Sequence, residues 1–132
     1  MTIFIDTSAF YALLDRDDAN HEAAKGAWTK ILNAESTLVT SNYVLVETFA
    51  LLQSRLGMIA VRAFQEDILP IINLEFVNLE THRSGTAALL AASKRSFSFV
   101  DCISFEIMRT LGIKKALAFD AHFKEAGFQV FP

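Results

Sequence analysis

Four acidic residues in this chain have surroundings that suit a chemical role better than a solvated surface. Asp6 ends the apolar run Ile3–Ile5, and Asp120 directly follows another apolar run. Glu47 and Asp101 lie in helical patterns where no Lys or Arg stands three or four residues away. Partly buried carboxylates without a cationic partner are costly, because desolvation and mutual repulsion disfavour their charged form. A divalent cation would relieve that cost, and hard oxygen ligands suit Mg²⁺ or Mn²⁺.

Each of these acids also has an ordinary structural interpretation when it is taken alone. Asp6 could cap a helix or sit in a turn, and Asp101 could be a first-turn acid that the helix dipole favours. Asp120 could cap a short helix that follows it. Glu47 fits such an interpretation less well, because its helical face is otherwise apolar. The four together indicate a site more strongly than any one of them.

The segments that must position these acids alternate between short strands and longer helices. Apolar runs bounded by polar residues or Gly predict strands, at Thr2–Ile5, Thr37–Thr40, Leu74–Leu79, Ala116–Phe119 and Phe128–Phe131. Apolar residues at three- and four-residue steps, with capping residues, predict helices, at Ser8–Asp15, His21–Ala34, Asn42–Leu56, Met58–Leu69, Thr81–Ser93, Val100–Leu111 and Ala121–Ala126. Strands separated by helices imply a parallel sheet covered on both faces. We therefore predict a three-layer α/β/α sandwich with a central, mainly parallel sheet.

This architecture predicts where the four acids meet. In open α/β sheets, sites form outside the carboxyl ends of the strands. Asp6 and Asp120 follow strands and reach that edge directly. Glu47 lies early in the helix after the second strand, and Asp101 lies at the start of another helix. We expect all four carboxylates to converge on one rim of the sheet.

Length and composition limit the class of protein. The 132 residues predict a single domain, residues 1–132, and 52% apolar residues supply a core. A net charge of −3 counts mildly against a module that coats nucleic acid through a basic surface. No uncharged apolar stretch approaches the roughly 18 residues of a membrane helix, so we expect no membrane association. The single cysteine, Cys102, cannot form an internal disulfide, which favours a cytoplasmic location.

Three stretches resemble a known family, the PIN domain, and in particular its small VapC-like toxins. They read FIDTSAFYALLD around Asp6, YVLVETFALL around Glu47, and SFVDCISFEIMRTLGIKKALAFDAHFKEAGF across Asp101 and Asp120. The resemblance implies an α/β/α sandwich with a central parallel sheet, in agreement with the fold predicted above. It also implies that these four acids bind one or two Mg²⁺ or Mn²⁺ ions.

The resemblance implies supporting residues as well. The hydroxyl residue after the first Asp, here Thr7 or Ser8, often supports the family's site, and Ser98 fits the placing of a Ser or Thr three residues before Asp101. One position departs from the family, which often has Thr or Ser two residues before its last Asp. This chain has Ala118 there, which weakens the expectation that Asp120 is a direct ligand.

The function that the resemblance implies is metal-dependent hydrolysis of RNA phosphodiester bonds. The chain would be the toxin of a toxin–antitoxin pair, with a single-stranded or structured RNA as substrate and a protein antitoxin as partner. Homodimers are common in the family, and apolar faces on the helices after Asn42 and Met58 could form one. Two alternatives remain open: a metal-binding PIN module without catalysis, and a Mg²⁺-dependent phosphatase of the haloacid dehalogenase type. That phosphatase family has a second Asp two residues after its first, where this chain has Ser8.

Other residues with chemical potential are given structural roles. Cys102 stands among apolar helical residues and is expected to pack. His21 and His82 lack metal-ligand spacing, and His122 is expected to be structural or at most accessory to Asp120. The basic residues that could contact an RNA backbone are expected mostly to form a solvated surface; they are Lys94, Arg95, Arg109, Lys114 and Lys115.

Overall fold

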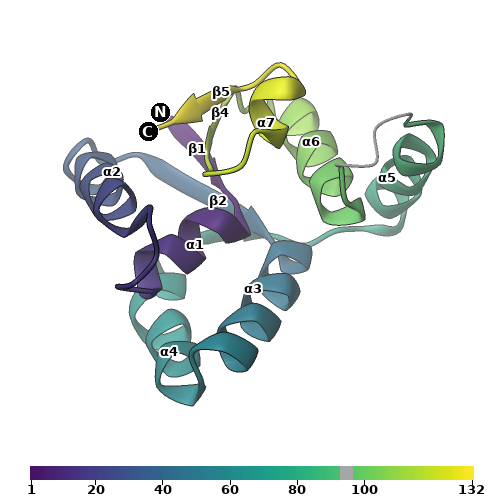
Figure 1. Cartoon of the computed structure of the whole chain (residues 1–132). Helices are drawn as coiled ribbons and strands as arrows, with labels where there is room; N and C mark the ends of the chain where they lie inside the picture. The colour runs from purple at the N-terminus through teal and green to yellow at the C-terminus, as the bar shows by residue number, and fades with distance from the viewer. Residues whose placement is uncertain (93–96) are drawn as a thin grey trace.

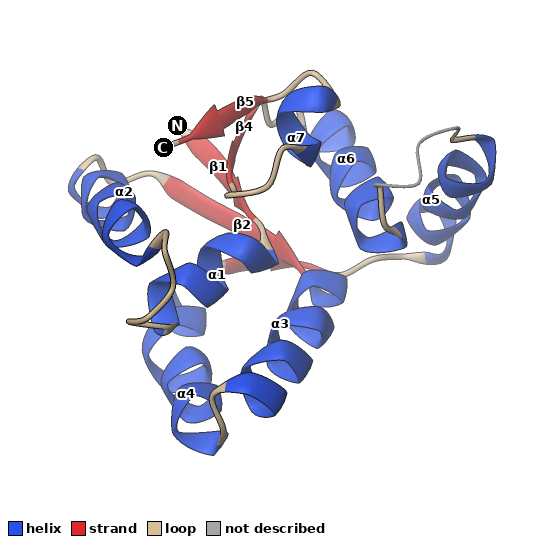
Figure 2. Cartoon of the chain, viewed as in Figure 1, coloured by secondary structure: helices blue, strands red, loops and turns tan. Residues whose placement is uncertain are grey.

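A five-stranded sheet lies at the centre of the fold in the computed structural model, which describes residues 1–92 and 97–132 (Figures 1 and 2). All strand pairings in it are parallel, in the order β3-β2-β1-β4-β5. The strands are β1 (Thr2–Ile5), β2 (Thr37–Ser41), β3 (Asn73–Glu75), β4 (Lys115–Leu117) and β5 (Gln129–Phe131). Helices cover both faces, so the predicted three-layer α/β/α sandwich with a parallel sheet is confirmed.

The helices divide between the two faces of the sheet (Figure 1). On one face lie α1 (Thr7–Leu14), α2 (His21–Asn33), α3 (Asn42–Arg55) and α4 (Met58–Ala63). On the other lie α6 (Phe99–Leu111) and α7 (His122–Glu125), with α5 (Leu79–Ala91) packed against α6. No helix in the described part of the chain is long and apolar enough to cross a membrane.

The central strand explains why the sheet forms as it does. Ile3, Phe4 and Ile5 of β1 are at most 2% exposed, because helices cover both faces of this strand. A strand buried on both faces is a continuous apolar run rather than an alternating one. The Phe4 ring lies 6.2 Å from the Phe123 ring of α7, which ties β1 to the second helical layer.

The direction of the strand order reverses between β1 and β4. From β1 the chain continues to β2 and β3 on one side of the sheet, and from β4 it continues to β5 on the other. The connections after these two neighbouring strands therefore leave in opposite directions. Ligands in open α/β sheets bind at such a switch point. The residues that follow β1 and β4 therefore lie at this switch point.

The boundaries of several elements differ from the prediction. The strand predicted at Leu74–Leu79 is only Asn73–Glu75, because Asn78 accepts a hydrogen bond from Thr81 N at 2.8 Å and caps α5. The helix predicted at Met58–Leu69 is α4 followed by a π-helical turn at Phe64–Ile68 and a 3₁₀ turn at Leu69–Ile71. The expected end of one helix at Ser93, and the candidate RNA contacts Lys94 and Arg95, lie outside the described residues.

Candidate metal centre

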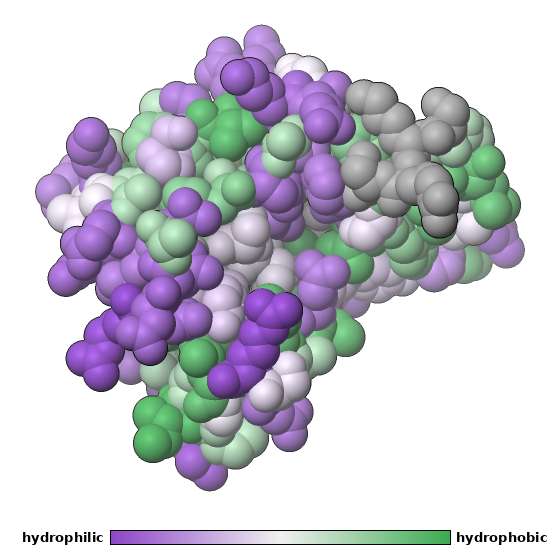
Figure 3. Space-filling view, viewed as in Figure 1, coloured by the Kyte–Doolittle hydropathy of each residue, from purple (hydrophilic) through white to green (hydrophobic). Residues whose placement is uncertain are grey.

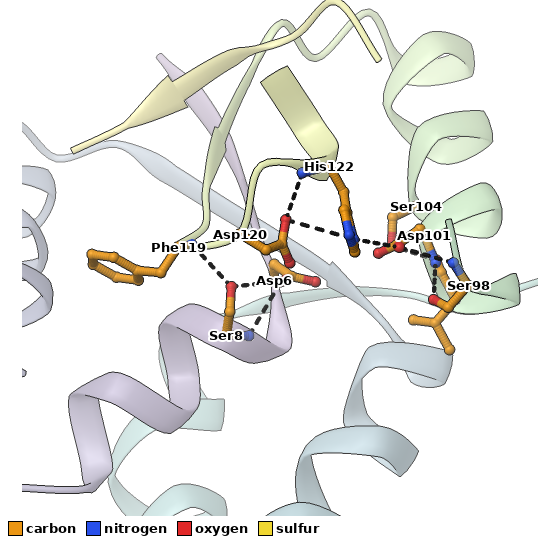
Figure 4. A network of polar contacts seen from close by, with 9 residues as sticks. Asp6, Ser8, Ser98, Asp101, Ser104, Phe119, Asp120 and His122 are labelled. Atoms are coloured by element: carbon orange, nitrogen blue, oxygen red, sulfur yellow. Dashed lines mark hydrogen bonds and ion pairs between the residues drawn. The ribbon is translucent and has the colours of Figure 1, made fainter. Parts of the chain in front are cut away.

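Asp6 stands where β1 ends and α1 begins. Its backbone N–H donates to Leu117 O at 3.1 Å, which continues the β1–β4 pairing by one residue. Its carboxylate caps α1, accepting hydrogen bonds from Ser8 N at 3.2 Å and from Ser8 Oγ at 2.6 Å. Ser8 Oγ in turn accepts from Phe119 N at 3.0 Å. One hydroxyl thus fixes the Asp6 carboxylate and holds the chain that leads to Asp120 (Figure 4).

Asp101 is held by the start of α6. Ser98 Oγ accepts from Asp101 N at 3.0 Å, and Asp101 Oδ2 accepts from Ser98 N at 3.0 Å. This reciprocal pair is a capping box, which satisfies two free N–H groups at the helix start. The Asp101 side chain therefore has one fixed orientation at the end of the helix. Asp101 is 6% exposed.

Asp120 and His122 complete the cluster from the loop between β4 and α7. Asp120 Oδ1 accepts a hydrogen bond from His122 N at 3.0 Å. His122 Nδ1 lies 2.8 Å from Asp101 Oδ2 and 3.8 Å from Asp120 Oδ1. This nitrogen is buried and faces both carboxylates. Asp101, Asp120 and His122 each offer a ligand atom, and these atoms lie within 4.8 Å of one another.

Burial and like charges make this cluster electrostatically costly. Burial raises the pKa of Asp6 from 3.8 to about 7; the Ser8 hydrogen bonds oppose this rise, and the charges of Asp120 and Asp101 add to it. Burial also raises the pKa of Asp101, against the opposing effect of Ser98 N–H and His122. Among the described residues, His122 is the only group able to carry positive charge that is in ion-pair contact with these acids. Carboxylate oxygens with too little positive charge around them fit a hard divalent cation.

Glu47 is placed beside this cluster and not within it. It is an exposed residue on α3, and it lines a small cavity with Tyr43, Val46 and Val100. Val100 directly precedes Asp101 on α6, so Glu47 borders the cluster from the facing helix. Of the four predicted acids, Asp101 and Asp120 therefore offer ligand atoms close to one another, and Asp6 lies near enough for their charges to raise its pKa. Glu47 lines the neighbouring cavity instead.

The predicted supporting residues have separate tasks. Ser8 and Ser98 bond to Asp6 and Asp101 respectively, as described above. Thr7 faces the other way: its hydroxyl lies 3.0 Å from Thr48 Oγ1 and donates to Val44 O at 3.4 Å, so it joins α1 to α3.

Two further residues bear on Asp120. Ala118, where the sequence differs from the family pattern, is 2% exposed. The loop after it is held by the hydrogen bond that Phe119 N donates to Ser8 Oγ. His122 was expected to be structural or at most accessory to Asp120, and the structure places it in the cluster. In the sequence, the only sign of this is its position two residues after Asp120.

Comparison with known proteins adds sequence and fold relationships to this geometry. The family model described as PIN domain matches residues 3–129. The chain is 39% identical over 127 residues to "23S rRNA-specific endonuclease VapC20" from two strains of Mycobacterium tuberculosis, covering 96% of this chain and 95% of that protein.

Two crystal structures share the fold. That of M. tuberculosis VapC20, described as a sarcin–ricin loop cleaving toxin, matches with a TM-score of 0.87 and 38% identity over 98% of this chain and 99% of the other. That of FitAcB from Neisseria gonorrhoeae matches with a TM-score of 0.70 over 100% and 97% of the two chains. At 13% identity, the second match concerns the fold alone.

Proposed function

This chain belongs to the PIN-domain family, and we propose that it is a VapC-like toxin, a metal-dependent endoribonuclease. The observation that carries the proposal is the meeting of Asp6, Asp101 and Asp120 at the β1/β4 switch point, in a chain related along nearly its whole length to an rRNA endonuclease. Carboxylates from three separate elements, two of them buried and all poor in cationic partners, suit a metal-assisted phosphodiester hydrolase.

We further propose that Asp6, Asp101 and Asp120 hold Mg²⁺ or Mn²⁺, with Glu47 and His122 at the border of the site. Such an ion acts as a Lewis acid on the phosphoryl group when it is bound. Ser8 and Ser98 keep two of the carboxylates in fixed orientations, so that the site needs little rearrangement to accept a cation. Supporting residues of this kind typically change metal affinity or activity by about 10–100-fold when they are removed.

The same carboxylates make RNA binding depend on the cation. The negative charge of these acids repels an RNA phosphate, and the repulsion is strong where water is partly excluded. Bringing the phosphate close therefore requires positive charge between it and the acids. This explains how a chain of net charge −3 can act on a polyanion.

Substrate and partners follow from the family as proposals. Because the related protein is specific for 23S rRNA, we propose a structured rRNA, with the sarcin–ricin loop as the first candidate. A protein antitoxin would hold the toxin inactive in the cytoplasm. A homodimer is the proposed assembly, and Met58 and Ile59 of α4, which are 46% and 85% exposed, offer apolar surface for it.

The test is cleavage of sarcin–ricin loop RNA, and of a mixed single-stranded RNA pool, by the purified chain with Mg²⁺ or Mn²⁺. We expect cuts that leave 5′-phosphates and that disappear both with chelator and with Asp101→Asn. Cleavage that survives Asp101→Asn would contradict the proposed site. A wild-type chain that binds Mn²⁺ but cuts neither RNA would favour a non-catalytic metal-binding module. The phosphatase alternative has no structural support, because Ser8 occupies the position of its second Asp and is bonded to Asp6 and Phe119.

A further inference from the structure

A small apolar cavity lies beside the acidic cluster, between α3 and α6. It has a volume of about 320 Å³ and is lined by Tyr43, Val46, Glu47 and Val100. Val46 is 70% exposed, so the cavity is a hollow open to solvent. Figure 3 shows hydrophobic surface on this face between the region of α3 and that of α6. The volume is at the lower end of the roughly 300–1,000 Å³ typical of small-molecule sites.

The cavity is lined by residues that neighbour the proposed metal centre. Val100 in its wall is the residue before Asp101, and Glu47 forms part of the same wall on the facing helix. A phosphate held at the acidic cluster would therefore place the neighbouring nucleotide of the same strand over this cavity.

An aromatic cluster from three helices holds the cavity wall in place. The Tyr43 hydroxyl and His82 Nδ1 are hydrogen-bonded, which joins α3 to α5. The Tyr43 ring lies 5.8 Å from both the His82 and the Phe99 rings, and those two rings lie 5.2 Å apart. Tyr43 is consequently fixed before any ligand arrives, which lowers the entropic cost of binding against it.

We propose that this cavity receives one unpaired nucleobase of the RNA, next to the phosphate that is cut. An apolar wall with a fixed aromatic ring suits the flat face of a base, and base–aromatic contacts tolerate different bases. The cavity thereby selects where along an unpaired segment the chain cuts, since a base must be free to enter it. This inference rests on the proposed ribonuclease function and adds a specificity site to it.

The experiment combines a cavity variant with base deletion in the RNA. Val46→Gln makes the wall polar without adding charge, and Leu90→Gln on α5, at an 80% exposed residue that lines no described cavity, is the matched control. We expect Val46→Gln to raise KM about 10-fold with kcat nearly unchanged, and Leu90→Gln to leave both within about twofold, as contacts to a single base predict.

Abasic substitutions at each position flanking the mapped cut then test the contact itself. One abasic position should raise the KM of the wild type about 10-fold and should not raise that of Val46→Gln further, because the same interaction is already lost. Equal effects of every abasic position on both proteins, or an unchanged KM for Val46→Gln, would overturn the proposal and leave the cavity to a protein partner.

A binding measurement separates this inference from the nuclease function. The same RNAs are titrated into Asp101→Asn protein, with and without Val46→Gln, and followed by fluorescence anisotropy. If the wild type cuts no RNA but the base-dependent difference in Kd remains, the nuclease proposal fails and the base site stands. If neither cleavage nor base-dependent binding occurs, both are wrong.

Discussion

Two acidic regions of this chain have similar composition and very different surroundings. The first is the loop between α1 and α2, with Asp15, Asp17 and Asp18, and the second is the cluster of Asp6, Asp101 and Asp120. In the loop, Asp15 accepts from Asp17 N at 3.0 Å and Asp18 accepts from Asn20 N at 2.8 Å. These are bonds to a residue two positions away, as in ordinary Asx turns.

The cluster is assembled by the sheet rather than by neighbouring residues. Its three carboxylates come from the end of β1, the start of α6 and the loop after β4, and two of them are at most 6% exposed. A local turn satisfies its carboxylate at little cost because water remains nearby. Carboxylates that the topology buries together carry a lasting electrostatic cost. The contrast shows that a candidate metal centre differs from an acidic loop in the burial of its carboxylates and in their origin from separate elements, more than in the number of acids.

The largest expected difference between the two regions is in how their acids make the free energy of unfolding depend on pH. The pKa of Asp6 is raised to about 7 in the folded chain from 3.8, so the folded state binds a proton that the unfolded state has released between these values. The contribution of Asp6 to the free energy of unfolding is therefore most favourable below about pH 4. This contribution falls as pH rises to about 7 and then stays low. The total loss of stability is roughly 1.4 kcal/mol for each unit by which the folded and unfolded pKa values differ.

Asp6→Asn removes this cost. In chelator, the variant should gain stability over wild type progressively from pH 4 to 7, reaching on the order of 2–4 kcal/mol, as measured by urea unfolding at each pH. Asp18→Asn, the loop control, should run parallel to wild type throughout. Parallel curves for Asp6→Asn as well would mean that the Asp6 carboxylate is not destabilised by its surroundings.

The adjacent hydroxyls of Thr7 and Ser8 test which of the two residues supports the cluster, with smaller expected effects. Ser8→Ala removes the bond that orients Asp6 and the bond to Phe119 N, so we expect Mn²⁺ affinity and RNA cleavage to fall about 10–100-fold. Thr7→Val removes a hydroxyl of the α1–α3 contact and should lower stability by about 1 kcal/mol with cleavage nearly unchanged. Calorimetric Mn²⁺ titration, steady-state cleavage and urea unfolding of both variants measure these effects. The reverse pattern would mean that Thr7, not Ser8, supports the site.

Most of the fold could be predicted because its signals are local. The buried run of β1, the stripe of α3 and the cap residues Ser41 and Gly112 fix where those elements lie. The error at Leu74–Leu79 arose where the local signal was misleading: the run is apolar, but Val77 N donates to Asn42 Oδ1 and Asn78 turns the chain into α5. That contact joins residues 35 positions apart and leaves no mark on the run itself.

The sequence was enough to predict at which edge of the sheet the candidate site lies, but not how its side chains face one another. The order of strands and helices places Asp6, Asp101 and Asp120 together, since all three follow from element boundaries. Which atoms face one another depends on side-chain packing. The approach of His122 to Asp101, and the marginal position of Glu47, become visible only once α3, α6 and α7 are packed on the sheet.

The most direct test of the central claim is calorimetric titration of Mn²⁺ into the metal-free chain, Asp101→Asn and Asp18→Asn at pH 7.5. We expect saturable binding to the wild type, an affinity at least about 10-fold lower for Asp101→Asn, and no change for Asp18→Asn. We also expect proton release on binding, because Asp6 is partly protonated near pH 7 in the free chain. Equal Mn²⁺ binding by the wild type and Asp101→Asn, or a loss of binding in Asp18→Asn, would show that the buried cluster is not the metal centre.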